Sequence, residues 1–196
     1  MLRILFSELN SNVKGPAIFL DRDGVINHRR ANDYVLHWSQ FIFVPGIRAA
    51  LKQMSLLGLP MIVISNQAAV GKGLLDLTGL REITIKMQEV LLEDGAPLAA
   101  AYYCVHRSDE NCACRKPKPG LLLAAAEDFD IDLSRSIFIG DSETDLQAAR
   151  AAGCVPVLFG SEMSSEPQPS ADLISVRGAT DLFALVANCV RDSGLA

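Results

Sequence analysis

Two acidic residues close a short apolar run near the start of the chain. Residues 17–20 are apolar, and Asp21, Asp23 and Gly24 follow them. A short apolar run bounded by turn signals is typical of a buried strand, and in an extended chain residues i and i+2 point the same way. Asp21 and Asp23 should therefore emerge together at the carboxyl end of a strand, where open α/β sheets bind ligands. Two neighbouring carboxylates repel each other unless a cation lies between them or one is protonated, although a simple Asp-Gly turn is the alternative.

Polar residues follow two more predicted strands, and a basic pair precedes a predicted helix. They are Ser65, Asn66 and Gln67 after residues 59–64, Asp141, Ser142 and Asp145 after residues 136–139, and Arg115 and Lys116 ahead of residues 117–129. Hydroxyl and backbone donors suit a transferring phosphoryl oxygen, and carboxylates suit a hard cation such as Mg²⁺. The simpler alternatives are helix caps and a solvated basic turn.

Three cysteines and a histidine form a second cluster, made of Cys104, His106, Cys112 and Cys114. A Cys-x-His pair and a Cys-x-Cys pair with five residues between them can close a tetrahedral Cys₃His zinc site. Such a site leaves no ligand position vacant, so the zinc would be structural and residues 104–114 would form a zinc loop. The alternative is a reduced cysteine cluster without metal.

Apolar runs alternate with helical patterns along the chain. Strands are expected near residues 17–20, 59–64, 99–104, 136–139, 154–159 and 171–176, and helices near 45–57, 78–92, 117–129, 144–152 and 180–190. This alternation predicts right-handed crossovers, and hence one α/β domain over residues 1–196 with a doubly wound parallel sheet. Residues 1–15 are expected to be a loosely docked extension, residues 28–43 a long functional loop and residues 160–170 a surface loop.

Composition restricts the class of protein. Of the 196 residues, 49% are hydrophobic and 21% are charged, which is typical of a globular domain. The net charge of -5 argues against nucleic acid or an anionic membrane as a partner, because both favour a basic stripe. No apolar run approaches the roughly 20 residues of a membrane helix, and no secretion signal is recognisable. We therefore expect a cytoplasmic monomer.

The strand-end motifs, in this order, resemble those of the haloacid dehalogenase superfamily, over about residues 17–160. The resemblance implies a Rossmann-like fold and hydrolysis of a phosphomonoester. Asp21 would be the nucleophile that forms an aspartyl-phosphate, and Asp23 the general acid/base. Ser65 and Lys116 would stabilise the phosphoryl group.

The same resemblance implies a catalytic Mg²⁺. Its ligands would be Asp21, Asp23 and Asp141, and Asp145 would orient either the metal shell or Lys116. Metal and ammonium together would cancel the repulsion between a carboxylate nucleophile and a phosphate.

The cysteine loop followed by Cys-Arg-Lys-Pro resembles the branch of the superfamily that contains heptose bisphosphate and histidinol-phosphate phosphatases. Members of that branch lack a large cap domain, so loops frame a small phosphorylated substrate. Asp-Tyr-Val at 33–35 and Lys-Pro-Gly-Leu-Leu-Leu at 118–123 favour a heptose bisphosphate, whereas the short gap between His106 and Cys112 keeps histidinol phosphate open. The residues expected to contact substrate are Arg29, Arg30, Tyr34, Asn66, Gln67, Arg115 and Ser142.

Two functions of another kind stay open. One is a zinc-stapled binding module without catalysis, against which the complete acidic set and the negative net charge argue. The other is a phosphotransferase, which would differ only in whether water or an acceptor hydroxyl reaches the aspartyl-phosphate.

Overall fold

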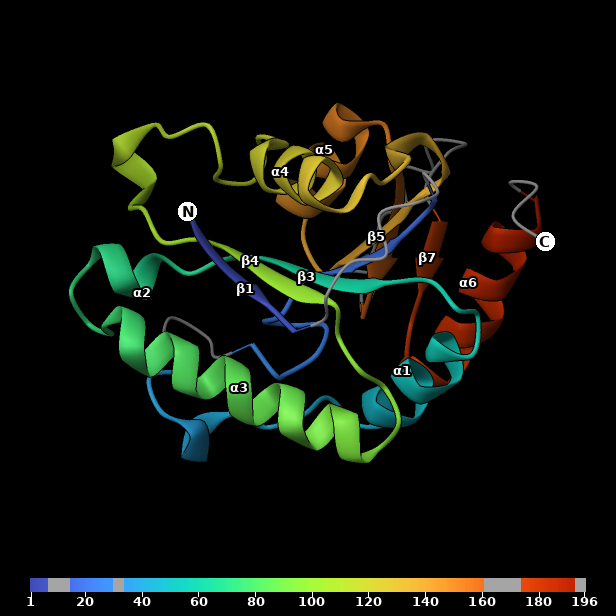
Figure 1. The fold of residues 1–196 in the computed structure, drawn as a ribbon, viewed down its shortest axis with the longest axis horizontal. Helices are drawn as coiled ribbons and strands as arrows, with labels where there is room; N and C mark the ends of the chain where they lie inside the picture. Colours follow the sequence, from blue (N-terminus) through green and yellow to red (C-terminus); the bar gives the residue numbers. More distant parts are fainter. Residues whose placement is uncertain (7–14, 30–33, 161–173, 193–196) are drawn as a thin grey trace, which may run out of the picture.

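The computed structural model describes residues 1–6, 15–29, 34–160 and 174–192, and one sheet runs through this part of the chain. Its strand order is β1-β4-β3-β2-β5-β6-β7 (Figure 1). The strands are β1 (Leu2–Leu5), β2 (Ile18–Leu20), β3 (Met61–Asn66), β4 (Ala100–Cys104), β5 (Ile137–Gly140), β6 (Val155–Phe159) and β7 (Ile174–Val176). All neighbouring strands are parallel except β1 and β4, so the predicted doubly wound α/β sheet is confirmed.

Helices cover both faces of the sheet (Figure 1). The helices α4 (Gly120–Phe129) and α5 (Glu143–Ala152) lie on one face, and α1 (Ile47–Ser55), α3 (Leu77–Glu93) and α6 (Ala179–Asp192) lie on the other. The short α2 (Ala68–Gly71) follows β3, and single 3₁₀ turns are formed by η1 (Trp38–Gln40), η2 (Ser108–Glu110) and η3 (Leu133–Arg135). Alternate strand residues enter two cores, since Ile18 and Leu20 pack with α1, α3 and α6 whereas Phe19 packs with α4 and α5. Burial on both faces explains why the strands are continuous apolar runs.

The register of the central strands aligns the predicted functional residues. Strand β2 lies between β3 and β5, and Leu20 is level with Val63 of β3 and Ile139 of β5. Because the three strands are parallel, their carboxyl ends meet at one edge of the sheet. Asp21 and Asp141 follow β2 and β5 directly and Ser65 lies near the end of β3, so they come to this edge.

The expectation that residues 1–15 form a loosely docked extension is wrong for the first six. Leu2–Leu5 form the edge strand β1, which pairs antiparallel with β4. Leu2 and Ile4 are buried in the core whereas Arg3 and Leu5 are exposed, so the segment has the alternation of a half-buried strand. Four residues are too few for that alternation to stand out in the sequence.

The segment between β2 and β3 holds no inserted domain among its described residues, 21–29 and 34–60. Instead Trp38, Phe41 and Phe43 pack on one another, with ring centroids 5.0 Å apart for Trp38–Phe41 and 5.1 Å apart for Phe41–Phe43. The predicted surface loop at 160–170 lies outside the described residues except for Gly160. None of the described helices has the length and hydropathy of a membrane span.

Candidate active site

A cavity of about 520 Å³ opens at the carboxyl edge of the sheet, and its volume is typical of a small-molecule site. Its walls combine acidic, basic and hydroxyl side chains contributed by β3 and by the segments that follow β2, α2, β4 and β5. The lining residues are Asp21, Asp23, Arg29, Tyr34, Val35, Ser65, Asn66, Lys72, Lys116, Ser142, Thr144 and Asp145.

Lys116 is buried in this cavity between two carboxylates. Its Nζ lies 2.8 Å from Asp21 Oδ1 and 2.6 Å from Asp145 Oδ1, and it donates a 3.0 Å hydrogen bond to the Ile64 carbonyl. Two carboxylates and one carbonyl oxygen therefore surround the ammonium group. Burial by itself would lower the pKa of Lys116, but Asp21 and Asp145 raise it above its usual value, so the group stays charged.

Lys116 and Asp145 are each fixed by further contacts. The Lys116 backbone forms a reciprocal pair with the Asn66 side chain, with N–H to Oδ1 and Nδ2 to carbonyl distances both 3.1 Å. Asp145 Oδ2 accepts hydrogen bonds from the Ser142 hydroxyl at 2.6 Å and the Ser142 backbone at 3.1 Å, which caps α5. The lysine is therefore bound to β3 and, through Asp145, to α5.

Asp21, Asp141 and Asp145 form a carboxylate cluster, with one oxygen of each within 4.8 Å of the others. Burial, followed by repulsion from Asp21, raises the pKa of Asp141 to about 7. Asp141 Oδ2 lies 3.3 Å from the Arg29 guanidinium, and its Oδ1 is buried without a hydrogen-bond partner among the described residues. Asp145 is already committed to Lys116 and Ser142. A hard divalent cation fits between Asp21 and Asp141, where the carboxylates crowd together and the buried Asp141 Oδ1 lacks a donor.

Gly24 allows Asp141 to approach the loop after β2. Its φ is +103°, and a Cβ built there would lie 1.8 Å from Asp141 Oδ2. A side chain at this position would displace the carboxylate, so the Asp-x-Asp-Gly sequence is needed for the shape of the acidic cluster as well as for its charge.

The Asp23 carboxylate points into a separate set of donors. It receives Arg22 Nη2 at 2.8 Å on both oxygens, Asn27 Nδ2 at 2.9 Å and Gln67 Nε2 at 2.7 Å. Burial raises the pKa of Asp23, but the charge of Arg22 and the hydrogen bonds from Arg22, Asn27 and Gln67 together outweigh this, so the net shift is downward. The side chain lines the cavity yet is not a member of the carboxylate cluster.

The predicted site residues are brought together with few exceptions. Gln67 is buried and donates to Asp23 and to Ser65 Oγ, so it supports other side chains and does not line the cavity. Arg115 is not among the lining residues either, and Arg30 lies outside the described residues.

Sequence reasoning missed three residues of this region. Arg22 stands between two acids and suggests a solvated residue, but it is 1% exposed. Lys72 lies in a Gly-Lys-Gly segment that suggests only a turn, and Thr144 lies in a predicted helix start. The one signal for Lys72 in the sequence was its position shortly after β3, because segments that follow a strand in this fold lie at the carboxyl edge of the sheet, where the cavity opens.

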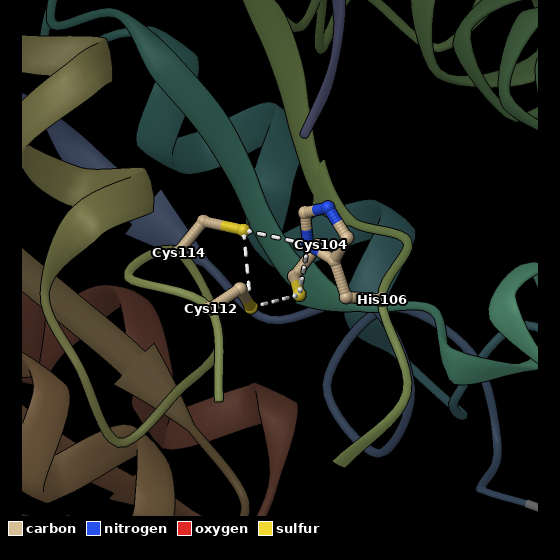
Figure 2. Close-up of side chains that lie close together, drawn as sticks. All are labelled: Cys104, His106, Cys112 and Cys114. Carbon is tan, nitrogen blue, oxygen red and sulfur yellow. Dashed lines mark hydrogen bonds between the residues drawn. The ribbon is translucent and has the colours of Figure 1, made fainter. Parts of the chain in front are cut away.

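The predicted zinc ligands meet in one cluster at the end of β4 (Figure 2). Neighbouring ligand atoms are 3.6 Å apart for Cys104–His106 and Cys104–Cys112, 3.2 Å for His106–Cys114 and 3.5 Å for Cys112–Cys114. A tetrahedral zinc with bonds of about 2.0–2.3 Å places its ligand atoms roughly 3.3–3.8 Å apart, so three of these distances lie in that range and the His106–Cys114 distance is slightly shorter. The four side chains therefore fit a closed Cys₃His zinc site. Burial raises the pKa of the Cys104 thiol to about 12, so a cation is needed for it to ligate as thiolate.

The cysteine loop, residues 104–114, packs tightly against two helices. A Cβ at Gly120, the first residue of α4, would lie 2.3 Å from the Ala113 carbonyl oxygen. A Cβ at Gly71, the last residue of α2, would lie 2.7 Å from the Val105 carbonyl oxygen. Lys118 Nζ also donates to the Asn111 and Cys112 carbonyls, both at 3.1 Å. The loop thus links α2 and α4 beside the Lys116 segment.

Comparison with known proteins agrees with this geometry. Residues 113–178 match the family model described as HAD-hydrolase-like. The chain is 38% identical over 161 residues to D-glycero-beta-D-manno-heptose-1,7-bisphosphate 7-phosphatase of Pseudomonas aeruginosa, covering 80% of this chain and 90% of that one. It is 34% identical to the D-glycero-alpha-D-manno-heptose-1,7-bisphosphate 7-phosphatase of Burkholderia mallei, covering 93% and 99% of the two chains.

A solved structure gives the same result for the fold. It is the D,D-heptose 1,7-bisphosphate phosphatase of B. bronchiseptica in complex with magnesium and phosphate, with a TM-score of 0.80, 31% identity and coverage of 92% of this chain and 99% of that chain. The resemblance inferred from the motifs is confirmed. The chain belongs to the haloacid-dehalogenase-like phosphatases, in the family of the heptose-1,7-bisphosphate 7-phosphatases.

Proposed function

We propose that this protein hydrolyses the 7-phosphate of D-glycero-D-manno-heptose 1,7-bisphosphate through an aspartyl-phosphate on Asp21. The observation that carries the chemistry is the buried contact of Asp21 with the Lys116 ammonium, 2.8 Å away, inside the 520 Å³ cavity. The substrate assignment rests on relatives of both anomeric names that match most of this chain.

Asp21 attacks the phosphorus atom in line, forming an O–P bond as the bond to the sugar oxygen breaks. Its Oδ1 also accepts a hydrogen bond from the Arg22 backbone at 2.8 Å, which fixes the carboxylate orientation. The attack joins two anions, so it requires nearby positive charge. Lys116 supplies one fixed charge, and the Ser65 hydroxyl and Asn66 amide line the cavity as donors toward phosphoryl oxygens.

Mg²⁺ fits this reaction through the Asp21 and Asp141 carboxylates, because Asp141 Oδ1 is buried without a donor and three carboxylates crowd one space. When bound, the ion would neutralise charge on the transferring phosphoryl group. The Asp23 side chain, predicted as a third ligand, is instead occupied by Arg22, Asn27 and Gln67, so we assign it no ligand role through its carboxylate.

Asp23 is the group proposed to move protons. In the first step it gives a proton to the departing sugar oxygen, and in the second it takes one from the water that opens the aspartyl-phosphate. Its lowered pKa keeps the carboxylate ionised, which is the form that accepts a proton in the second step. For the first step, the charge of an incoming phosphate dianion raises the pKa of this carboxyl and favours the protonated form.

We further propose that Cys104, His106, Cys112 and Cys114 hold a structural Zn²⁺. Four ligands at tetrahedral separations leave no position for substrate, so this ion would take no part in the reaction. Its role would be to hold the loop that leads into Arg115 and Lys116.

Phosphate release from three substrates tests the proposed function. Purified protein is assayed with the α- and β-anomers of the heptose bisphosphate and with histidinol phosphate, with and without Mg²⁺. We expect Mg²⁺-dependent release from at least one heptose anomer, at a kcat/KM at least tenfold above that for histidinol phosphate. Preference for histidinol phosphate, or release that is independent of Mg²⁺, would overturn the assignment.

A further inference from the structure

We propose that Lys72 recognises the second phosphate of the bisphosphate substrate and thereby sets selectivity for a bisphosphate over a monophosphate. The inference rests on the proposed function, since it assigns a residue to the non-reacting end of the same substrate. A second phosphate brings about two further negative charges into a cavity that already contains acidic residues, so it requires a cation of its own.

Lys116 is not available for that role. Its ammonium group is already paired with Asp21 and Asp145 and donates to the Ile64 carbonyl, and the side chain is 4% exposed at the floor of the site. Any cation for a second phosphate must come from elsewhere on the cavity wall.

Two other basic residues line the cavity, Arg29 and Lys72. Arg29 lies 3.3 Å from Asp141 and so belongs to the acidic cluster. Lys72 differs, because among the described residues its ammonium has no carboxylate in ion-pair range. Its Nζ donates instead to the Tyr34 hydroxyl at 2.8 Å and lies 5.3 Å from the centre of the same ring. A charged group on an exposed cavity wall whose partner is a neutral phenol is suited to an anionic ligand.

Asp109, an acid that is influenced by the charge of Lys72, already has a cation of its own. Lys72 exerts a minor influence on Asp109 in the cysteine loop, but the Asp109 carboxylate receives Arg107 Nε at 3.0 Å and Nη2 at 2.8 Å. Asp109 therefore has its own cation, and the charge of Lys72 stays directed to the cavity and to Tyr34.

The backbone that carries Lys72 is held in place. The residue follows α2, and its N–H donates to the Ala68 carbonyl at 3.0 Å, only a few residues beyond Ser65 and Asn66. On its other side Gly71 packs against the cysteine loop so closely that a Cβ would lie 2.8 Å from the Arg107 backbone nitrogen. The lysine thus extends from a fixed point, with Tyr34 orienting its head group.

Matched substrates test this assignment. The kcat/KM values for heptose 1,7-bisphosphate and for heptose 7-phosphate are measured for the wild type, for Lys72→Gln and for Lys72→Arg, because the two sugars differ only in the second phosphate. We expect Lys72→Gln to reduce the bisphosphate-to-monophosphate ratio by about 10- to 100-fold, mainly through KM, since one charge-assisted contact is lost. Lys72→Arg should retain most of the ratio because it keeps the charge. Tyr34→Phe removes the hydroxyl that orients Nζ and should give a smaller reduction.

The control is Lys86→Gln, which removes an exposed lysine on α3 that pairs with Glu82 outside the cavity and should leave both values unchanged. A ratio that is the same in Lys72→Gln and wild type, or a wild type that does not distinguish the two sugars, overturns the inference while leaving the proposed function intact. Failure of the wild type to hydrolyse the bisphosphate overturns both. Circular dichroism of each variant identifies any loss of fold.

Discussion

At the scale of single residues, the site is a balance of buried charges. Asp21, Asp141 and Asp145 crowd together, and Lys116 forms ion pairs with two of them, Asp21 and Asp145. Isolated charges of this kind are costly to bury, so each is tolerated only because its partners are fixed. The same arrangement prepares the site for a dianionic group and a divalent cation.

Replacing Asp21 with Asn should abolish turnover while keeping the shape of the side chain. The amide is not a nucleophile toward phosphorus, so we expect kcat to fall by at least about 10³-fold, a loss of roughly 4 kcal/mol of transition-state stabilisation. Phosphate release and trapping of a phosphorylated protein are the measurements. Glu82→Gln on the surface of α3 is the control. Activity above one tenth of wild type in Asp21→Asn would exclude this carboxylate as the nucleophile.

Arg22 is a positioning residue for Asp23. Its guanidinium donates to both carboxylate oxygens, and the single ammonium of Lys cannot reproduce this planar contact. We expect Arg22→Lys to reduce kcat for the sugar phosphate by about 10- to 100-fold with little change in KM.

The readout for Arg22 is the dependence on leaving group. p-Nitrophenolate departs without protonation, so its phosphate ester should be affected at least threefold less than the sugar phosphate in Arg22→Lys. Equal losses on both substrates would instead indicate general damage to the site, and a lowered thermal midpoint would identify that damage.

At the scale of elements, the cysteine loop connects α2 and α4, two helices that the pairing of strands does not join directly. Its glycine contacts fix it against α2 on one side and α4 on the other, and both neighbouring segments contribute a lysine to the cavity, Lys72 and Lys116. If the proposed zinc is bound there, its loss should therefore weaken activity as well as stability.

Cys112→Ser tests this link. Removing one thiolate from a closed Cys₃His site should reduce bound zinc from about one per chain to well below half, lower the thermal midpoint by several degrees and reduce kcat/KM by about tenfold. Metal analysis, thermal unfolding and phosphate release are measured on the same preparation. Cys189→Ser in α6 lies outside the cluster and serves as the matched control. Zinc content unchanged in Cys112→Ser would contradict the assigned ligand set.

At the scale of the whole molecule, the edge strand β1 completes the sheet next to β4. Ile4 is 8% exposed and packs in the core, whereas the adjacent Leu5 is 54% exposed. Ile4→Ala should therefore lower the free energy of unfolding by about 2–3 kcal/mol, while Leu5→Ala should change it by about 0.5 kcal/mol or less. Urea titration of the two variants gives this difference directly. Equal values would mean that β1 does not contribute to the cooperative core.

The sequence predicted the central strands and the acids that follow them because buried parallel strands leave long apolar runs and their ends share one edge. The clustering of Cys104, His106, Cys112 and Cys114 was also predictable, since their spacing along the chain is short. Arg22, by contrast, could not be recognised as buried, because its burial depends on neighbours far away in the chain, among them Tyr103 of β4. Gln67 was expected to contact substrate because its hydrogen bonds to Asp23 and Ser65 appear only in the folded chain. Lys72 was missed because its contact with Tyr34 spans 38 positions.

The antiparallel course of β1 has a practical consequence for how the protein is handled. Leu2 pairs with Tyr103, so the first residue of the chain lies beside the cysteine cluster and not at the opposite edge. Burial raises the pKa of the Cys114 thiol, and the amino group of Met1 is near enough to act in the opposite direction. A polyhistidine affinity tag fused ahead of Met1 would therefore lie next to this cluster and compete for the zinc proposed to bind there. Metal stoichiometry should be determined only after such a tag has been cleaved.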